Sequence, residues 1–410
     1  MMDFIHSLNL EEKLSPRRNA DIIWFYIFLP SVIAYFVVLT GFINAKPTIG
    51  SIETIDPAFI SLIYPGKEME VIATDLGWAE GPLWVQDDAA SLSYLMFSDT
   101  ITNRIYKWEE GKGMFTVGKT IYVENSGCKY DQEYCDKMYE PGSNALWKRD
   151  TTSLDLLVCQ HGERAVALLR DNGTRSAIAT HFNGSKLNSP NDLVVSPEGH
   201  MYFTDPPYGL YNKNRSLTGK EVKHNGLYMI RSEYIHIATE SGQPTDQVWL
   251  MDGTLNRPNG LAFSPDFSKL YVSNSDVINP IWKVYDVSDT GILKNGRIFY
   301  DASHIYQEEC VHSIDSDTSN SYTSTSKKPL CETYGAPDGM KVDINGNLFA
   351  TGPGGVLVLS PEGRLLGRFH LDRPVSNLAF GADGRLYMTA KDIVIRVWIK
   401  TKPNRVVNKA

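Results

Sequence analysis

The sequence predicts an all-β protein, a six-bladed β-propeller preceded by a single transmembrane helix near the N-terminus. Three observations lead to this fold class. A unit of turn, short strand, turn and second strand recurs along the chain, its strands alternate apolar and polar residues, and one long uncharged apolar segment precedes every repeat. Repeats at intervals of tens of residues are typical of solenoids and propellers. Short strands joined by Pro-, Gly- and Asn-rich turns favour the propeller.

The apolar segment, residues 22–43, contains no charged residue and is long enough to cross a bilayer as a helix. Arg17 and Arg18 precede it and only Lys46 follows closely, so the positive-inside rule places the N-terminus in the cytoplasm. We therefore expect a signal anchor and a single-pass type II membrane protein whose propeller lies in the secretory pathway or outside the cell. The alternative is a cleaved signal peptide and a secreted protein, although the segment is longer than the usual signal-peptide core.

These boundaries divide the chain of 410 residues into five parts. The predicted parts are a cytoplasmic tail (1–21), the anchor (22–43), a linker that leads into the lumenal domain (44–68), the propeller (69–400) and a short tail (401–410). The net charge of −8 argues against a nucleic-acid partner, because proteins that bind polyanions are usually basic.

The cysteines and glycosylation sequons agree with an oxidising, lumenal environment. All five cysteines follow the apolar segment. Cys128 and Cys135 flank a short polar loop, and Cys310 and Cys331 flank a Ser/Thr-rich insertion, so two local disulfides are predicted. Cys159 lies in the apolar run LDLLVCQ, which favours a buried thiol. Sequons that predict N-glycosylation stand at Asn172, Asn183 and Asn214.

The repeats supply both the blade count and the position of a candidate site. Four units share one pattern, namely PNDLVVSPEGHMYFTD (190–205), PNGLAFSPDFSKLYVSN (258–274), PDGMKVDINGNLFAT (337–351) and SNLAFGADGRLYMTA (376–390). Residues 80–108 and 142–169 have the same rhythm, so the units number six, one for each four-stranded blade. The long intervening stretches 121–141, 209–224 and 302–334 are expected to be loops.

Polar residues stand at the turn that enters the first strand of several units. The first strand of a propeller blade lines the central channel, so Asn191, Asn259 and Asp338 are expected to converge, with Glu80 of the turn WAEGP as a fourth member. Two carboxylates and two amide oxygens are hard donors that suit Ca²⁺ or Mg²⁺ better than Zn²⁺. The competing interpretation is that Asn-Gly, Asn-Asp and Asp-Gly pairs after proline are simply turn formers.

Four segments resemble the gluconolactonase/regucalcin (senescence-marker-protein) family. They are LNSPNDLVVSPEGHMYFTDPPYGL, RPNGLAFSPDFSKLYVSNSD, GAPDGMKVDINGNLFATGPGGVLVLSPEG and SNLAFGADGRLYMTA, and FTDPPYGL and PDGMKVD are characteristic of its microbial gluconolactonase branch. The resemblance covers roughly residues 69–395. It implies a six-bladed propeller with one divalent cation, usually Ca²⁺ with Zn²⁺ or Mg²⁺ as alternatives, that hydrolyses sugar lactones. The family's metal ligands fall on Glu80, Asn191, Asn259 and Asp338, and its acid/base carboxylate falls on Asp338.

Further residues are candidates for substrate contacts. His161 in CQHGERAV is an alternative base or a substrate contact, and Arg164 either holds substrate or forms a structural ion pair. Asp205 in FTDPPYG either contacts substrate or caps a turn, and Asn188 and Asn377 are further polar candidates. The regucalcin branch has an arginine where this chain has Ser189, so that branch's substrate contacts do not transfer.

Three function classes remain open from the sequence. The first is a membrane-anchored hydrolase of lactones, with aryl esters or phosphotriesters as further substrates for the same kind of cation. The second is a strictosidine-synthase-like propeller, against which the full set of four oxygen ligands argues. The third is a non-catalytic binding module, which the loop between Cys310 and Cys331 would favour.

Overall fold

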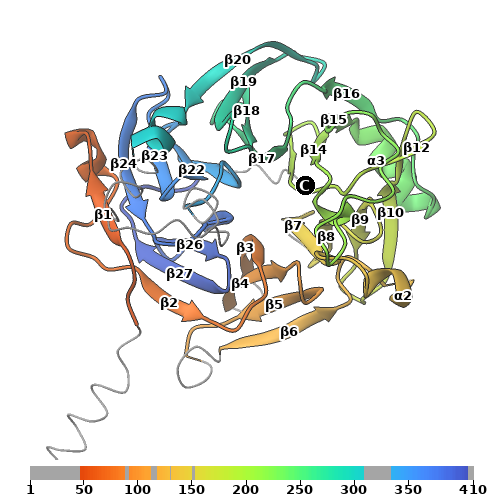
Figure 1. Cartoon of the computed structure of the whole chain (residues 1–410), viewed down its shortest axis with the longest axis horizontal. Coiled ribbons are helices and arrows are strands. Elements are labelled where there is room, and N and C mark those ends of the chain that lie inside the picture. The colour runs from red at the N-terminus through yellow and green to blue at the C-terminus, as the bar shows by residue number, and fades with distance from the viewer. Residues whose placement is uncertain are drawn as a thin grey trace, which may run out of the picture. The chain divides into compact units, whose positions relative to one another are not determined.

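Six antiparallel sheets of four or five strands follow one another around a ring (Figure 1). The computed structural model describes residues 47–87, 92–111, 118–129, 131–149, 153–308 and 334–404. The innermost strands of neighbouring sheets contact one another, so together they surround the axis of the ring. The predicted six-bladed propeller is therefore confirmed.

Five of the blades are continuous in the chain. From the axis outward, the first blade consists of β3 (Ala79–Asp87), β4 (Leu92–Asp99), β5 (Arg104–Trp108) and β6 (Lys119–Glu124), and the second of β7 (Ser143–Lys148), β8 (Leu156–Gln160), β9 (Ala165–Leu169) and β10 (Arg175–Ala179). The third blade consists of β13 (Leu193–Val195), β14 (Met201–Asp205), β15 (Gly226–Ile230) and β16 (Trp249–Asp252), and the fourth of β17 (Pro258–Phe263), β18 (Lys269–Asn274), β19 (Ile281–Val287) and β20 (Leu293–Asp301). The fifth blade consists of β21 (Met340–Val342), β22 (Leu348–Gly352), β23 (Gly355–Leu359) and β24 (Leu365–His370).

The sixth blade closes the ring with strands from the two ends of the propeller. Its inner three strands are β25 (Asn377–Phe380), β26 (Arg385–Ala390) and β27 (Ile393–Trp398), and its outer strand is β2 (Glu70–Ala73), far away in the sequence. Val71 pairs with Ile395 in this antiparallel contact. The N-terminal strand is thereby tied to the C-terminal strands, which closes the ring of blades.

The segment predicted as a linker contributes structure of its own. Strand β1 (Ser51–Thr54) pairs with β24 as a fifth, outermost strand of the fifth blade, with Ser51 opposite His370. The 3₁₀ helix η1 (Pro57–Ser61) follows and buries Phe59 against Phe369. The described fold therefore begins before residue 69, where the repeats predicted the propeller to start.

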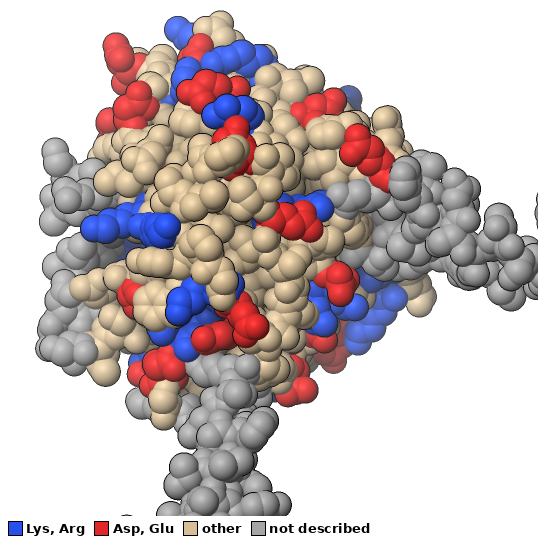
Figure 2. All heavy atoms as spheres, turned by 90° about the vertical axis from the view of Figure 1, so that its left-hand side faces the viewer, with Lys and Arg blue, Asp and Glu red and all other residues tan. Residues whose placement is uncertain are grey.

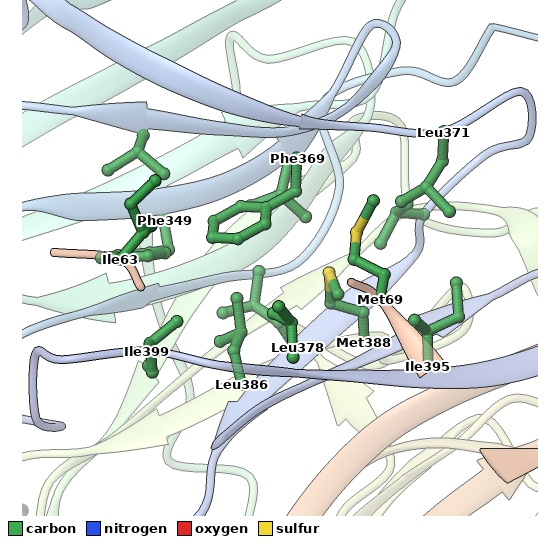
Figure 3. Close-up of a cluster of buried hydrophobic side chains, with 14 of the residues drawn as sticks. Ile63, Met69, Phe349, Phe369, Leu371, Leu378, Leu386, Met388, Ile395 and Ile399 are labelled. Carbon is green, nitrogen blue, oxygen red and sulfur yellow. The ribbon is translucent and has the colours of Figure 1, made fainter. Parts of the chain in front are cut away.

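Apolar side chains between adjacent blades form the core. Figure 3 shows one cluster, in which Phe349 and Phe369 of the fifth blade face Leu386, Met388 and Ile395 of the sixth. All five are almost completely inaccessible to solvent. Truncation of such a residue to alanine typically costs about 2–5 kcal/mol, because it loses transfer free energy and leaves a cavity.

Short elements between strands cover the ends and the outer edge of the ring. They are α2 (Gln132–Cys135), the hairpin β11 (His181–Phe182) and β12 (Ser185–Lys186), η2 (Tyr208–Leu210) and α3 (Ser232–Ser241). The sequence did not predict α3, which ends at Gly242 in the left-handed conformation and packs Ala238 into the core of the second and third blades.

Charged side chains of both signs are interspersed on the face that bears β1 and β24 (Figure 2). Arg368 pairs with Glu53 at 2.8 Å, and Arg364 pairs with Asp56 at 3.1 Å.

No helix in the described part of the chain is both long and apolar enough to span a membrane. The predicted anchor, residues 22–43, lies outside the described residues and stays a prediction. Cys310 and Cys331 also lie outside them, so their predicted disulfide stays a prediction as well.

Candidate active site

The four predicted ligands occupy one structurally repeated position, where the innermost strand of a blade begins. Glu80 lies on β3 opposite Ser98, and Asn259 lies on β17. Asn191 and Asp338 immediately precede β13 and β21. In the second and sixth blades the same position is held by Asn144 and Ser376. The ligand set therefore comes from four blades of the six.

Glycines next to the ligands let neighbouring inner strands approach closely. A Cβ on Gly260 would lie 2.3 Å from the carbonyl oxygen of Asp338, and a Cβ on Gly81 would lie 2.1 Å from that of Asn144. Such distances are not tolerated, so only glycine fits. The Asn-Gly and Glu-Gly pairs thus reflect backbone contact between blades, which the turn-former interpretation does not explain.

Hydroxyl side chains on the second strands fasten each ligand segment to its neighbour. Thr204 donates a hydrogen bond to the carbonyl oxygen of Asn259 at 2.8 Å, and Ser273 donates one to that of Asp338 at 2.8 Å. Ser98, on β4, makes the corresponding bond to Asn144, and Ser376, which precedes the inner strand β25, donates to Ala79. These bonds fix the backbone of the ligand residues from behind, independently of any bound ion.

The two carboxylates of the site are held in a poorly solvated and mutually repulsive arrangement. Burial is the main cause that raises the pKa of Glu80 to about 8, and the charge of Asp192 adds to it. Burial first and then the charge of Glu80 raise the pKa of Asp338 well above its usual range. A cation between the two groups would reverse both effects, because it favours the ionised forms.

The donor atoms fit a hard divalent cation. Within the described residues, neither Asn191 Oδ1 nor Asp338 Oδ1 has a hydrogen-bond partner, although both atoms are buried. Buried oxygen atoms in native proteins are almost always satisfied, so these two are available to a ligand. Among the residues described, no group of three or more His, Cys, Asp or Glu side chains could hold a metal ion. A cation here would depend on the two amides as well as the two carboxylates.

Lys341 and Asp192 are two further charged residues near the candidate ligands, and the sequence analysis did not identify them. The Lys341 ammonium donates to Asn377 Oδ1 at 3.2 Å and to the Met340 carbonyl oxygen at 3.0 Å. Burial lowers the pKa of Lys341, while Asp192 and Glu80 act in the opposite direction. Asn377 Oδ1 therefore already accepts two hydrogen bonds, one from Lys341 and one from the backbone N–H of Leu378.

His161 lies in the wall of the site together with two residues that sequence reasoning missed. The Nδ1 atom of His161 lies 3.8 Å from Glu140 Oε2, and the ring is completely buried. Burial lowers the pKa of His161 to about 4 and raises that of Glu140 to about 7. The Tyr208 side chain lies beside Asn259 and Ser275. Tyr208 could have been identified from the sequence by its place in the PPYG segment.

Arg164 does not reach this wall. Its guanidinium donates to the carbonyl oxygens of Leu187 and Lys186 and pairs with Glu221 at 3.2 Å. Of the two interpretations offered by the sequence, the geometry favours the structural ion pair.

Asn188 and Asp205 belong to a buried network at the third blade. Asp205 Oδ2 accepts a hydrogen bond from the backbone N–H of Asn188 at 2.7 Å, and the Asn188 amide donates to the Asp205 carbonyl oxygen. Lys220 donates to Asn188 Oδ1 and to Asn225. Burial is the main cause that raises the pKa of Asp205 to about 7. The network joins two loops of the same blade, which favours the turn-capping role.

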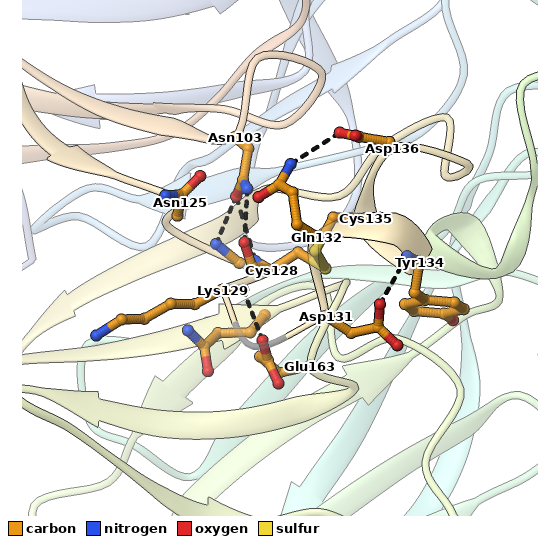
Figure 4. The surroundings of a disulfide bond; sticks show 12 residues. Asn103, Asn125, Cys128, Lys129, Asp131, Gln132, Tyr134, Cys135, Asp136 and Glu163 are labelled. Atoms are coloured by element: carbon orange, nitrogen blue, oxygen red, sulfur yellow. Dashed lines mark hydrogen bonds between the residues drawn. A yellow bond between two sulfur atoms is a disulfide. The ribbon is translucent and has the colours of Figure 1, made fainter.

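The cysteines of the described part behave as the sequence predicted. Cys128 and Cys135 form a disulfide (Figure 4), and Asn103 donates to the Cys128 carbonyl oxygen at 2.8 Å. Cys159 is a free, buried thiol whose pKa is raised mainly by burial, so it is a poor nucleophile. The three sequon asparagines, Asn172, Asn183 and Asn214, are exposed, which leaves glycosylation a prediction.

Residues 78–392 match the family described as the SMP-30/gluconolactonase/LRE-like region. The chain belongs to this family. Its similarity to the gluconolactonase of Zymomonas mobilis extends over 359 residues at 33% identity and covers 86% of this chain and 87% of that protein. The family resemblance seen in the repeats is thereby confirmed.

Solved structures of other proteins share the fold. A gluconolactonase from Xanthomonas campestris superposes with a TM-score of 0.63 at 24% identity, covering 87% of this chain and 98% of that one. Regucalcin from Agrobacterium tumefaciens, described as a calcium-binding protein, gives a TM-score of 0.52 at 15% identity and covers 88% of this chain and 97% of its own. These likenesses support the propeller architecture.

Proposed function

We propose that this protein is a metal-dependent lactonase that opens a sugar lactone at the ring of ligands in its channel. The observation that carries the proposal is the set of four oxygen ligands at equivalent positions of four blades, with two of their buried oxygens free of hydrogen bonds. Its similarity to a gluconolactonase over most of both chains supports the same reaction class.

Glu80, Asn191, Asn259 and Asp338 would hold a divalent cation, with Ca²⁺ the best match, which would act as a Lewis acid toward the lactone carbonyl. Water adds its oxygen to the carbonyl carbon, the ring C–O bond breaks, and the departing ring oxygen receives a proton. The Asp338 carboxylate, which would also ligate the cation, is the candidate to orient the attacking water and to take its proton.

Neutral His161 is the weaker candidate for the base. Its pKa of about 4 makes the imidazole a poor proton acceptor at neutral pH. The intact ligand set also argues against a non-catalytic binding module, because scaffolding needs no buried carboxylates that repel one another. We further propose that the propeller is lumenal or extracellular, on the strength of the apolar segment and the formed disulfide.

The test is hydrolysis of a lactone panel by the purified full-length chain and its Asp338→Ala variant. D-Glucono-δ-lactone and an aryl ester are followed by base consumption, with spontaneous hydrolysis subtracted. Loss of Asp338 should lower kcat by about 10²–10⁴-fold, as expected for an acid/base group, and leave the melting temperature within a few degrees of wild type. A folded variant that retains full activity would remove Asp338 from the mechanism.

A further inference from the structure

An apolar segment without a charged residue is exposed where the fifth and sixth blades meet. Residues 57–66, which begin with η1, direct apolar side chains both inward and outward. Phe59 and Leu62 are buried in the core between the two blades. Ile60 and Tyr64 are 46% and 43% exposed. Packing of the core therefore explains one side of the segment and leaves the exposed apolar side unexplained.

Lysines from the C-terminal end of the propeller border this segment. The Lys400 ammonium donates to the Ile60 carbonyl oxygen at 3.0 Å and lies 5.5 Å from the centre of the Tyr64 ring. The Lys402 carbonyl oxygen accepts a hydrogen bond at 3.0 Å from the backbone N–H of Ile344, whose side chain is 47% exposed. We name the surface formed by these five residues the basal face.

The acidic side chains beside the basal face do not cancel its positive charge. Asp343 precedes Ile344 but is completely buried, and its carboxylate accepts a hydrogen bond from the Thr401 hydroxyl at 2.7 Å. Asp56, which caps η1, pairs with Arg364 at 3.1 Å. Isoleucine, tyrosine and lysine on one surface suit the headgroup boundary of a bilayer, where apolar groups enter the acyl region and ammonium groups contact phosphate.

The basal face lies at the end of the ring opposite to the candidate ligands. Asp338 precedes the innermost strand β21 and Ile344 follows it, so the two residues lie at opposite ends of the channel. Ile278, by contrast, lies at the ligand end. It stands in the loop after β18, and Asn274, which ends that strand, pairs with Pro258 at the start of β17. The Ile278 side chain is 88% exposed.

The linker from the predicted anchor to the propeller is short. Residues 44–47 alone separate the anchor from Thr48, and the extended chain covers at most about 18 Å in that length. The headgroup layer of one leaflet takes up about 6 Å of it. Thr48 pairs with Glu70 at the start of β2, and the turn in which the Lys67 backbone N–H donates to the Tyr64 carbonyl oxygen at 3.2 Å leads from the basal face into that strand. An anchored propeller therefore keeps this edge close to the bilayer surface.

We propose that the basal face lies against the lipid bilayer in which residues 22–43 are anchored, and that the candidate ligands consequently face the aqueous phase. The short linker makes the contact with lipid intramolecular, so a few half-exposed apolar side chains are enough to fix the orientation. Substrate then enters the channel from water and not from the bilayer. The inference rests on the proposed membrane anchor and does not depend on the lactonase reaction.

The test places the photo-reactive residue p-benzoylphenylalanine at single positions of the full-length chain in phosphatidylcholine vesicles. It replaces Ile60 or Ile344 on the basal face, and Ile278 at the ligand end is the matched control because it is the more exposed side chain. Illumination should attach phospholipid, identified by the mass of the adduct, at positions 60 and 344. Position 278 should carry no lipid.

A second variant disrupts the basal face. Ile60→Asp combined with Tyr64→Asp should lower lipid attachment at position 344 by about tenfold or more, because the apolar contact with the bilayer is lost and two charges are added. Ile278→Asp should leave that attachment unchanged. The melting temperature of each variant shows whether the propeller remains folded.

The alternative outcomes separate the docking from the anchor. Protein that stays in the vesicles through alkaline carbonate extraction, but attaches lipid at none of the three positions or at all of them alike, overturns the docking and leaves the anchor standing. Attachment to a second copy of the chain in place of lipid identifies a protein interface and also overturns the docking. Release of the wild type by carbonate contradicts the anchor, and the inference with it.

Discussion

At the scale of single residues, the six blades are not chemically equivalent. Five of them present a carboxylate or an amide at the start of the inner strand, among them Asn144 of the second blade, while Ser376 holds that position in the sixth. Ser376 is engaged in a contact between blades, since its hydroxyl donates to the Ala79 carbonyl oxygen at 2.6 Å. In our proposal, one repeated backbone position serves ion binding in some blades and packing in others.

Asp205 provides a residue-scale prediction about pH. Its pKa of about 7 in the folded state lies above the usual 3.8, so the folded protein binds the proton more tightly. Stability from this group is therefore present at low pH and is lost as the pH rises from about 4 to about 7. The unfolding free energy of wild type minus that of Asp205→Asn should fall across this window, by at most about 1.4 kcal/mol per pH unit.

Denaturant titrations of the two proteins at several pH values measure this difference, in which other titrating groups largely cancel. Above pH 7 the difference should become constant. A difference that stays flat from pH 4 to pH 7 would show that Asp205 titrates normally in the folded protein.

At the scale of elements, the backbone position at the start of an inner strand is fixed by contact with the inner strand of the adjacent blade. Gly260 has no room for a side chain against Asp338. The Ser273 hydroxyl accepts a hydrogen bond from the Gly260 backbone N–H and donates one to the Asp338 carbonyl oxygen, each at 2.8 Å. A change here should move a ligand without altering any ligating atom.

Gly260→Ala tests this coupling. It should cost at least about 2 kcal/mol of unfolding free energy and weaken Ca²⁺ binding, because the Asp338 backbone must shift. Gly66→Ala is the control, since Gly66 has a positive φ but no atom within 4 Å of an added Cβ. That control should cost only about 1 kcal/mol and leave calorimetric Ca²⁺ affinity intact. Equal effects of the two variants would show that the inner strands do not constrain the site.

The disulfide gives a second prediction for an element. Cys128→Ser and Cys135→Ser should each lower the unfolding free energy by about 2 kcal/mol, since both open the same seven-residue loop. Reductant should destabilise wild type by a similar amount and leave both variants unaffected. Denaturant unfolding measures these changes. Free thiols at either position in the untreated wild type, seen as a mass shift after alkylation, would refute the pairing.

At the scale of the whole molecule, the repeats in the sequence predicted the blade number because each blade carries its own strand and turn pattern. They could not reveal that β2 completes the sixth blade or that β1 joins β24, since both strands lie outside the repeats and pair with distant partners. The candidate ligands could be proposed from the sequence because they recur near one repeat position. Glu140 and Tyr208 could not be, because they come from loops that occur only once.

The N-terminal anchor is a prediction for the full chain. If residues 22–43 span a membrane, the expressed protein should stay in the membrane fraction after alkaline carbonate extraction, and added protease should not reach the propeller in sealed microsomes. A change of the segment to polar residues should release the propeller into the soluble fraction. Quantitative release of the wild type by carbonate would contradict the anchor.

The central claim is that one divalent cation at the four-blade ligand ring is required for lactone hydrolysis. The most direct test removes metal from the full-length protein with a chelator and then measures bound metal and gluconolactone hydrolysis together during titration with Ca²⁺, Mg²⁺ or Zn²⁺. Activity should disappear in the metal-free protein and return in proportion to one bound cation per chain, with Asn259→Leu lowering both. Full activity in metal-free protein would contradict the claim.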